Sequence, residues 1–238
     1  MLVWFATACG VRRDESASTA RQSRDTTPAT PAPDARPVLL CFGTSLTAGL
    51  GLAAEEAFPA LLQHKIDSAG YAFRVVNAGV SGETAAAGLR RIDWLLQRPI
   101  RVLLLELGAN DALRGQDIAD AKRNLQEIID RTRARYPDVR VVVAGMEAPP
   151  NLGPRYTREF RDLFVDLARA NRAVLIPFLL EGVAGQADLN QADGIHPTAA
   201  GARIVADRVW RTLEPVLRAA GRTGPAPEDG RNGPSRGP

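Results

Sequence analysis

The chain reads PVLLCFGTSLTAGLG from residue 37 to residue 51, an apolar run followed by a segment rich in glycine, serine and threonine. Its first part, Val38–Phe42, is a nearly continuous run of large apolar residues, which is typical of a strand covered on both faces. Gly43 then allows a sharp turn, which leaves Ser45 at the carboxyl end of that strand. Taken alone, a serine in this place more often forms a turn or caps a helix than carries out chemistry.

Further apolar runs resemble the first and alternate with segments of helical periodicity. They are Phe73–Asn77, Val102–Leu107, Val139–Gly145 and Ala173–Phe178. Between the runs, apolar residues recur at helical spacing, as at Phe58, Leu61, Leu62 and Ile66. This alternation predicts an α/β fold in which a five-stranded parallel sheet has helices on both faces, a three-layer α/β/α sandwich. Functional groups of such sheets gather in the loops beyond the carboxyl ends of the strands.

Length and charge separate one domain from two polar ends. The 238 residues, 45% of them hydrophobic, favour one compact domain, which we place at residues 37–217. Residues 10–36 and 218–238 are poor in large apolar residues, so we expect a disordered linker and a disordered tail. Both ends hold more Arg than acidic residues, and the formal net charge is only +3, so the domain is near neutral. A face that follows nucleic-acid phosphates is therefore not indicated.

Residues 1–9 resemble the end of a bacterial lipoprotein signal. The short apolar stretch MLVWFATA ends in small residues, and Cys9 follows it directly. We therefore expect export and lipidation of Cys9, which would make the protein periplasmic or membrane-anchored. The alternative is an inert extension of a cytoplasmic protein. No segment approaches the roughly 20 apolar residues of a membrane-spanning helix.

A reactive serine needs a base, and the chain contains two histidines. His64 falls on the polar face of its predicted helix, so we expect it at the solvated surface. His196 lies in the loop DGIHP, in which Asp193 can reach Nδ1 of the imidazole and leave Nε2 free to face a nucleophile. Ser45, His196 and Asp193 are the candidate nucleophile, general base and orienting acid. The alternative is that Asp193 and Thr198 only form a turn and a helix cap.

Acyl transfer also requires hydrogen-bond donors for the charge that develops on the carbonyl oxygen. Two loops at predicted strand ends offer such donors. The glycines of NAGVSGET, residues 77–84, allow exposed backbone N–H groups, and Asn110 of GAND, residues 108–111, can present its side-chain amide. We expect the neighbouring Glu83 and Asp111 to be loop or cap groups and not catalysts.

Four blocks, GTSLTAGLG, NAGVSGET, LGANDALRG and DGIHP, resemble in order and spacing those of the SGNH (GDSL-type) hydrolase family. The chain looks most similar to the branch of bacterial arylesterases and multifunctional acyl thioesterase/lysophospholipases, over about residues 37–217. The resemblance implies a flavodoxin-like sandwich in which Ser45 is the nucleophile and Asp193 and His196 complete the triad. It also implies an oxyanion hole formed by the backbone N–H groups of Ser45 and Gly82 and by the amide of Asn110.

One position departs from the family pattern. Thr44 stands where the family usually has Asp, which changes the hydrogen-bond support of the nucleophile loop.

The resemblance further implies the hydrolysis of carboxylic esters or thioesters of small molecules through an acyl-Ser45 intermediate. Such chemistry needs no metal and no organic cofactor, and neither a nucleic acid nor an obligate protein partner is expected. Alternatives are a carbohydrate O-deacetylase on the same fold and, further away, a non-catalytic binding module. We expect the loop at residues 146–153 to line the substrate site, because Met146, Pro149 and Leu152 suit an acyl chain better than a sugar.

Overall fold

The computed structural model describes residues 34–221, and Cys9 with most of the predicted linker and tail lies outside these residues. Its centre is one sheet of five parallel strands in the order β2-β1-β3-β4-β5. The strands are β1 (Val38–Gly43), β2 (Arg74–Gly79), β3 (Val102–Glu106), β4 (Arg140–Ala144) and β5 (Val174–Ile176). The predicted parallel sheet is thus confirmed, with strand ends within three residues of the apolar runs.

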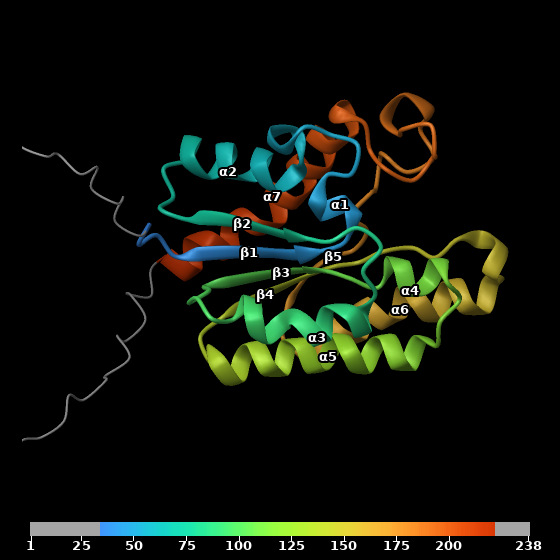
Figure 1. Cartoon of the computed structure of the whole chain (residues 1–238), viewed down its shortest axis with the longest axis horizontal. Helices are drawn as coiled ribbons and strands as arrows, with labels where there is room; N and C mark the ends of the chain where they lie inside the picture. Colours follow the sequence, from blue (N-terminus) through green and yellow to red (C-terminus); the bar gives the residue numbers. More distant parts are fainter. Residues whose placement is uncertain (1–33, 222–238) are drawn as a thin grey trace, which may run out of the picture. The chain divides into compact units, whose positions relative to one another are not determined.

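Helices cover both faces of the sheet, which explains why its central strands are apolar throughout. All residues of β1 and β3 are buried. Helices α2 and α7 lie on one face, and α3, α5 and α6 lie on the other (Figure 1). The longer helices are α2 (Phe58–Ser68), α3 (Ala85–Leu95), α5 (Ile118–Arg135), α6 (Pro154–Ala170) and α7 (Ala199–Gly221).

Short helices occupy several of the loops at the carboxyl ends of the strands. They are α1 (Ser45–Ala48), α4 (Ala109–Leu113) and the 3-10 turns η1 (Ala54–Glu56), η2 (Pro150–Leu152) and η3 (Ala187–Leu189). Each is less than two helical turns long, and such short elements leave no periodic signal in a sequence.

The end of α7 differs from the expected domain boundary at residue 217. The helix continues to Gly221, and Ala220 is buried against the core. Within residues 34–221, no helix combines the length and the apolar character needed to cross a membrane.

The strand order places a topological switch point at the carboxyl ends of β1 and β3. The chain leaves β1 for β2 on one side and returns to β3 on the other, so the loops after these strands diverge and leave space between them. Ser45 follows β1, and Asn110 follows β3. The strand order therefore brings the first and third sequence blocks to the same edge of the sheet.

Candidate active site

Ser45 is the first residue of α1, directly beyond β1. Thr44 is the N-cap of that helix, and the backbone N–H of Leu46 points to its hydroxyl. A residue at the start of a helix has no intrahelical acceptor for its N–H, so the Ser45 N–H remains available as a donor. Gly43, which was expected to allow a sharp turn, does not have a positive φ. Glycine is needed there because a Cβ atom would lie 2.1 Å from the Thr47 hydroxyl and 2.4 Å from Glu106 Oε2.

His196 meets Ser45 from a loop that closes on itself. Asn190 and Pro197 form an isolated antiparallel bridge, and the backbone N–H of Gln191 donates to the carbonyl of His196 at 2.7 Å. Within this loop, Asp193 Oδ2 lies 2.6 Å from His196 Nδ1, and His196 Nε2 lies 2.8 Å from Ser45 Oγ. The structure thus aligns all three predicted residues in one hydrogen-bonded relay.

Asp193 is held as a carboxylate by the turn that it forms. Its Oδ1 accepts hydrogen bonds from the backbone N–H groups of Ile195, at 2.9 Å, and His196, at 3.0 Å. These bonds, above all those from the backbone and ring of His196, hold the pKa of Asp193 well below its usual range. An ionised carboxylate at Nδ1 fixes the imidazole tautomer with a free lone pair on Nε2, which is the form that accepts a proton from serine.

The loop after β2 is joined directly to residues 43–47, which we call the serine turn. The backbone N–H of Val80 donates to the carbonyl of Gly43 at 3.0 Å. Gly82 has a φ of +78°, a left-handed conformation that glycine adopts without strain. No hydrogen bond within residues 34–221 engages the Gly82 N–H. This N–H is therefore free to bind a substrate oxygen.

Side chains after β3 hold the Gly82 loop from the other side. Asn110 Nδ2 donates to the Glu83 carbonyl at 3.0 Å, and an amide nitrogen has a second hydrogen to offer. Arg114 donates to the Gly82 carbonyl at 2.9 Å. Asp111 accepts the Ala85 N–H at 2.9 Å. The Gly82 N–H is thus presented on a loop in which the Gly82 and Glu83 carbonyl groups are already engaged.

The residues expected to be bystanders occupy structural places. Glu83 is buried in an ion pair with Arg91, at 2.6 Å between Oε1 and Nε. Asp111 caps the start of α3 through Ala85. His64 is exposed on α2. None of the three joins the relay.

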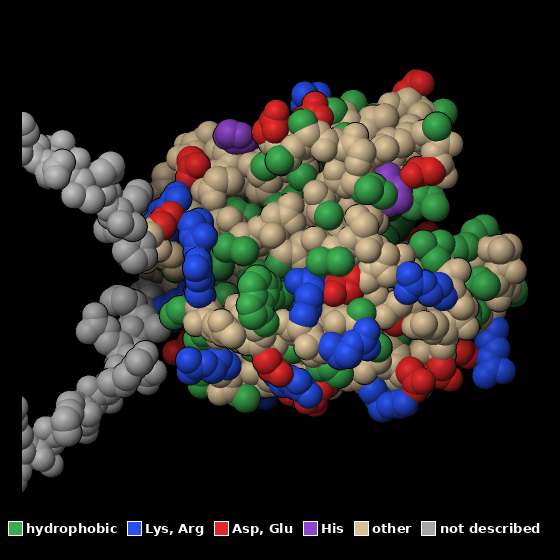
Figure 2. Space-filling model, in the orientation of Figure 1, with side chains coloured by type: hydrophobic (Ala, Val, Ile, Leu, Met, Phe, Trp, Pro, Cys, Tyr) green, Lys and Arg blue, Asp and Glu red, His purple; other side chains and the backbone are tan. Residues whose placement is uncertain are grey.

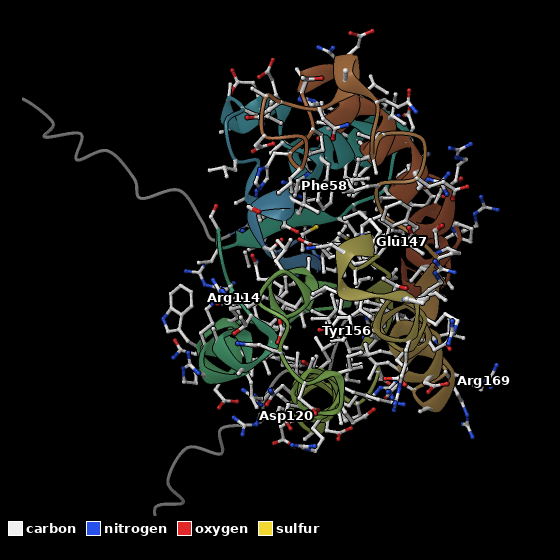
Figure 3. All side chains as sticks on the ribbon, turned by 90° about the vertical axis from the view of Figure 1, so that its right-hand side faces the viewer. Phe58, Arg114, Asp120, Glu147, Tyr156 and Arg169 are labelled. Atoms are coloured by element: carbon white, nitrogen blue, oxygen red, sulfur yellow. The ribbon has the colours of Figure 1, made fainter. Side chains whose placement is uncertain are left out.

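A small apolar hollow of about 10 Å³ touches Ser45 and His196. Its other lining residues come from α1 and the loop after it, from α2 and α7, from the loop of His196 and from the segment after β5, among them Leu50, Phe58 and Leu180. Figure 2 shows the molecule hollowed at its right-hand edge, where the strands end in Figure 1, with hydrophobic side chains close by. In Figure 3, which looks onto this edge, Phe58 lies above and Tyr156 below.

The expected substrate-lining loop lies elsewhere along this edge. Met146 is buried in the core, Leu152 packs partly buried against it, and Pro149 is half-buried. None of them lines the hollow beside Ser45. Met146 faces inward because it lies only two residues beyond β4, whose residues pack between the helix layers. The lining role of the loop stays a prediction.

Two residues that support the site were missed by reading the sequence. Glu106, the last residue of β3, is fully buried and accepts hydrogen bonds from Thr44 and Thr47. A single acid within the apolar run VLLLEL was the signal, because a buried charge requires donors nearby. Gln191 donates through Nε2 to the Leu50 carbonyl at 2.7 Å. It thus joins residues 190–197, which we call the histidine loop, to the loop after α1. No local pattern distinguishes this glutamine.

Known proteins are similar to this chain over most of the described domain. A family model for the GDSL-like lipase/acylhydrolase family matches residues 41–204. The esterase TesA of Pseudomonas aeruginosa is 42% identical over 181 residues, which are 75% of this chain and 89% of that protein. The thioesterase 1/protease 1/lysophospholipase L1 of Escherichia coli is 36% identical over 75% of this chain and 84% of its own.

A solved structure agrees with these matches. The crystal structure of the psychrotrophic esterase EstA from a Pseudoalteromonas species, inhibited by monoethylphosphonate, has a TM-score of 0.72 and 34% identity. It covers 76% of this chain and 98% of EstA. With the family match extending over most of the domain that carries Ser45 and His196, the chain belongs to the GDSL-like lipase/acylhydrolase family.

Proposed function

We propose that this protein hydrolyses carboxylic esters or thioesters of small molecules, with Ser45 as nucleophile, His196 as general base and Asp193 as the orienting acid. One observation carries the proposal: Asp193 Oδ2, His196 and Ser45 Oγ form a continuous relay with distances of 2.6 and 2.8 Å. These separations lie within hydrogen-bond reach, as a general base and its nucleophile require.

The reaction proceeds in two acyl transfers. Ser45 Oγ attacks the carbonyl carbon while His196 Nε2 takes the serine proton, and Asp193 stabilises the imidazolium that results. The N–H groups of Ser45 and Gly82 and the amide of Asn110 donate to the oxyanion. His196 then returns its proton to the leaving alkoxide or thiolate. Water next attacks the acyl-Ser45, gives its proton to His196 and releases the acid, and the proton returns to Ser45.

The surface around Ser45 favours an acyl chain over a sugar. The hollow beside Ser45 and His196 is small and is lined mainly by apolar residues. Four large apolar side chains also stand about half exposed on the loops and short helices that carry the site, and we call them the apolar rim: Leu50, Val80, Leu113 and Ile195. Burial of such surface by an acyl chain gains about 25 cal/mol per Å², whereas a sugar gains little there.

Labelling with a reactive phosphonate ester tests the nucleophile directly. The reagent should phosphonylate Ser45, which peptide mass spectrometry locates, and Ser45→Ala should remain unlabelled. Covalent labelling at another residue, with hydrolysis unaffected in Ser45→Ala, contradicts the assignment. A series of p-nitrophenyl esters from acetyl to dodecanoyl, compared with an O-acetylated sugar, then tests the substrate class. Preference for the sugar would support the deacetylase alternative.

We also propose that the protein is exported and lipid-modified at Cys9, which lies outside the described residues. The support is the small-residue stretch before Cys9 and the polar segment after it. Expression of the gene with its upstream codons in a bacterial host, followed by fractionation, tests this. Diacylglyceryl-modified Cys9 should appear in the membrane fraction and disappear in Cys9→Ala. Soluble cytoplasmic protein that retains Met1 would end the idea.

A further inference from the structure

A buried carboxylate lies directly behind the serine turn. Glu106 ends β3 and has no exposed surface. Its Oε2 accepts from the Thr44 N–H at 2.8 Å and from the Thr47 hydroxyl at 2.7 Å, and its Oε1 accepts from the Thr44 hydroxyl at 2.9 Å. One carboxylate therefore holds the residue immediately before Ser45 and the residue two positions after it.

Glu106 accepts hydrogen bonds but forms no ion pair with a positively charged side chain of the described residues. Both threonine hydroxyls and the Thr44 N–H supply protons, and no Lys or Arg of residues 34–221 pairs with Glu106. Burial raises the pKa of Glu106, and the hydrogen bonds from Thr47 and Thr44 oppose that rise. A buried carboxylate without a cation lowers stability compared with an apolar side chain of similar size. Stabilisation of the fold therefore does not explain why a glutamate occupies position 106.

The backbone around Ser45 is shaped to admit this carboxylate. A Cβ atom on Gly43 would come within 2.4 Å of Glu106 Oε2, so the glycine makes room for it. Thr44 and Thr47 are themselves fully buried. Two contacts fix Thr44, one through its N–H and one through its hydroxyl, and the orientation of the following peptide sets the directions of the Ser45 N–H and side chain.

We propose that Glu106 is a positioning residue that holds Ser45 toward His196 through Thr44 and Thr47. The proposal rests on the esterase function proposed above and deepens it. Thr44 suits this arrangement, because its hydroxyl bonds to Glu106. The threonine hydroxyl donates to Glu106, whereas an aspartate would bring a second carboxylate against it, and two neighbouring carboxylates cannot both ionise without a large penalty.

The substitution Thr47→Val tests the proposal with a matched control. Valine keeps the shape of threonine and removes one donor to Glu106. Thr132→Val is the control, because Thr132 is equally buried but donates to the Ile128 carbonyl within α5, at 2.7 Å. Since a misplacement of about 1 Å costs about 10²-fold in rate, we expect Thr47→Val to lower kcat about tenfold and to slow phosphonate labelling equally. KM should change little, and Thr132→Val should leave both rates unchanged.

Two substitutions of Glu106 provide a rescue test. In Glu106→Gln, the amide oxygen can accept from the Thr44 N–H and the Thr47 hydroxyl, and the amide nitrogen can donate to the Thr44 hydroxyl. Glu106→Leu removes every contact. We expect Glu106→Leu to lose about 10²-fold in kcat and Glu106→Gln to keep at least tenfold more activity than Glu106→Leu. Equal losses in the two variants would contradict positioning by hydrogen bonds.

The outcomes separate this proposal from the proposed function. If wild type hydrolyses esters and Thr47→Val matches Thr132→Val in kcat and labelling rate, Glu106 is only structural and the positioning role is wrong. If wild type fails to hydrolyse esters and Ser45 is not labelled, the function itself is wrong. Because Thr47→Val keeps the carboxylate and the packing, the result does not depend on whether Glu106→Leu folds.

Discussion

The two loops that meet at the reactive serine are held in opposite ways. The serine turn is held from the core, through buried Thr44 and Thr47 and the buried carboxylate behind them. The histidine loop bonds mainly to itself, and its Asp193 side chain is 43% exposed. The pKa values of the two carboxyl groups are also shifted in opposite directions: hydrogen bonds lower the pKa of Asp193, and burial raises the pKa of Glu106. Ser45 is thus positioned by residues of the buried core, whereas His196 is positioned mainly by its own loop.

The largest effect is expected where the loops meet. Ser45→Ala and His196→Ala should each lower kcat by about 10⁴–10⁶-fold, and the double variant should lose little more, because the residues act as a unit. His64→Ala is the matched control and should be silent, since His64 lies exposed on α2. Steady-state kinetics with a p-nitrophenyl ester measures this. An inactive His64→Ala protein beside an active His196→Ala protein would reverse the choice of base.

A smaller loss is expected from the donors between the loops. Asn110→Ala should lower kcat by about 10²–10³-fold with little change in KM, because its amide meets charge that exists only in the transition state. The Asn110 amide also donates to the Glu83 carbonyl, so the melting temperature should be recorded in parallel. A change confined to KM would make Asn110 a ground-state binding group.

Two glycine substitutions compare how firmly the serine turn and the histidine loop are held. Gly43→Ala places a methyl group against Thr47 and Glu106 and should destabilise by about 1–3 kcal/mol or more, as overpacking does. Gly194 has a φ of +71°, and no atom beyond its chain neighbours lies within 4 Å of the position that a methyl group would take there. Gly194→Ala should therefore cost only the left-handed conformation, about 1–2 kcal/mol. Urea unfolding measures both. Equal losses would mean that the histidine loop is held as firmly as the serine turn.

The smallest effect should distinguish the two carboxylates by pH. Because the folded pKa of Asp193 is lowered, its stabilising contribution is present above the unfolded pKa of about 3.9 and is lost as pH falls further. Because the folded pKa of Glu106 is raised, wild type loses stability as pH rises above about 4.3, the unfolded value for Glu. Between pH 3 and pH 8, the melting temperature of wild type should therefore exceed that of Asp193→Asn, and that of Glu106→Gln should exceed that of wild type. Both differences should be larger near neutral pH than at pH 3. Parallel curves would contradict the opposite shifts.

Reading the sequence succeeded where the determinants are local. Continuous apolar runs predict the strands, because residues covered on both faces must all be apolar. The spacing of Asp193 and His196 predicts their contact, because three residues in one turn bring the two side chains together. The meeting of Ser45 with His196 needed the parallel sheet as well, since 151 positions separate them.

The features that were missed depend on contacts distant in the sequence. Glu106 looked like an interruption of an apolar strand, and only the neighbouring β1 shows that Thr44 satisfies it. The contact of Gln191 with Leu50 spans 141 positions and has no local signature. Gly43 was expected to serve the turn, but the structure shows that its missing side chain makes room for a carboxylate from another strand.

The late position of His196 in the chain has a consequence during biosynthesis. The serine turn and its supporting strand β3 are complete by residue 106, but the base is added only at residue 196, after every strand of the sheet. A partly synthesised chain therefore carries an ordinary, unactivated serine. In the proposed mechanism, Ser45 can therefore be activated only after the loop that carries His196 has been synthesised.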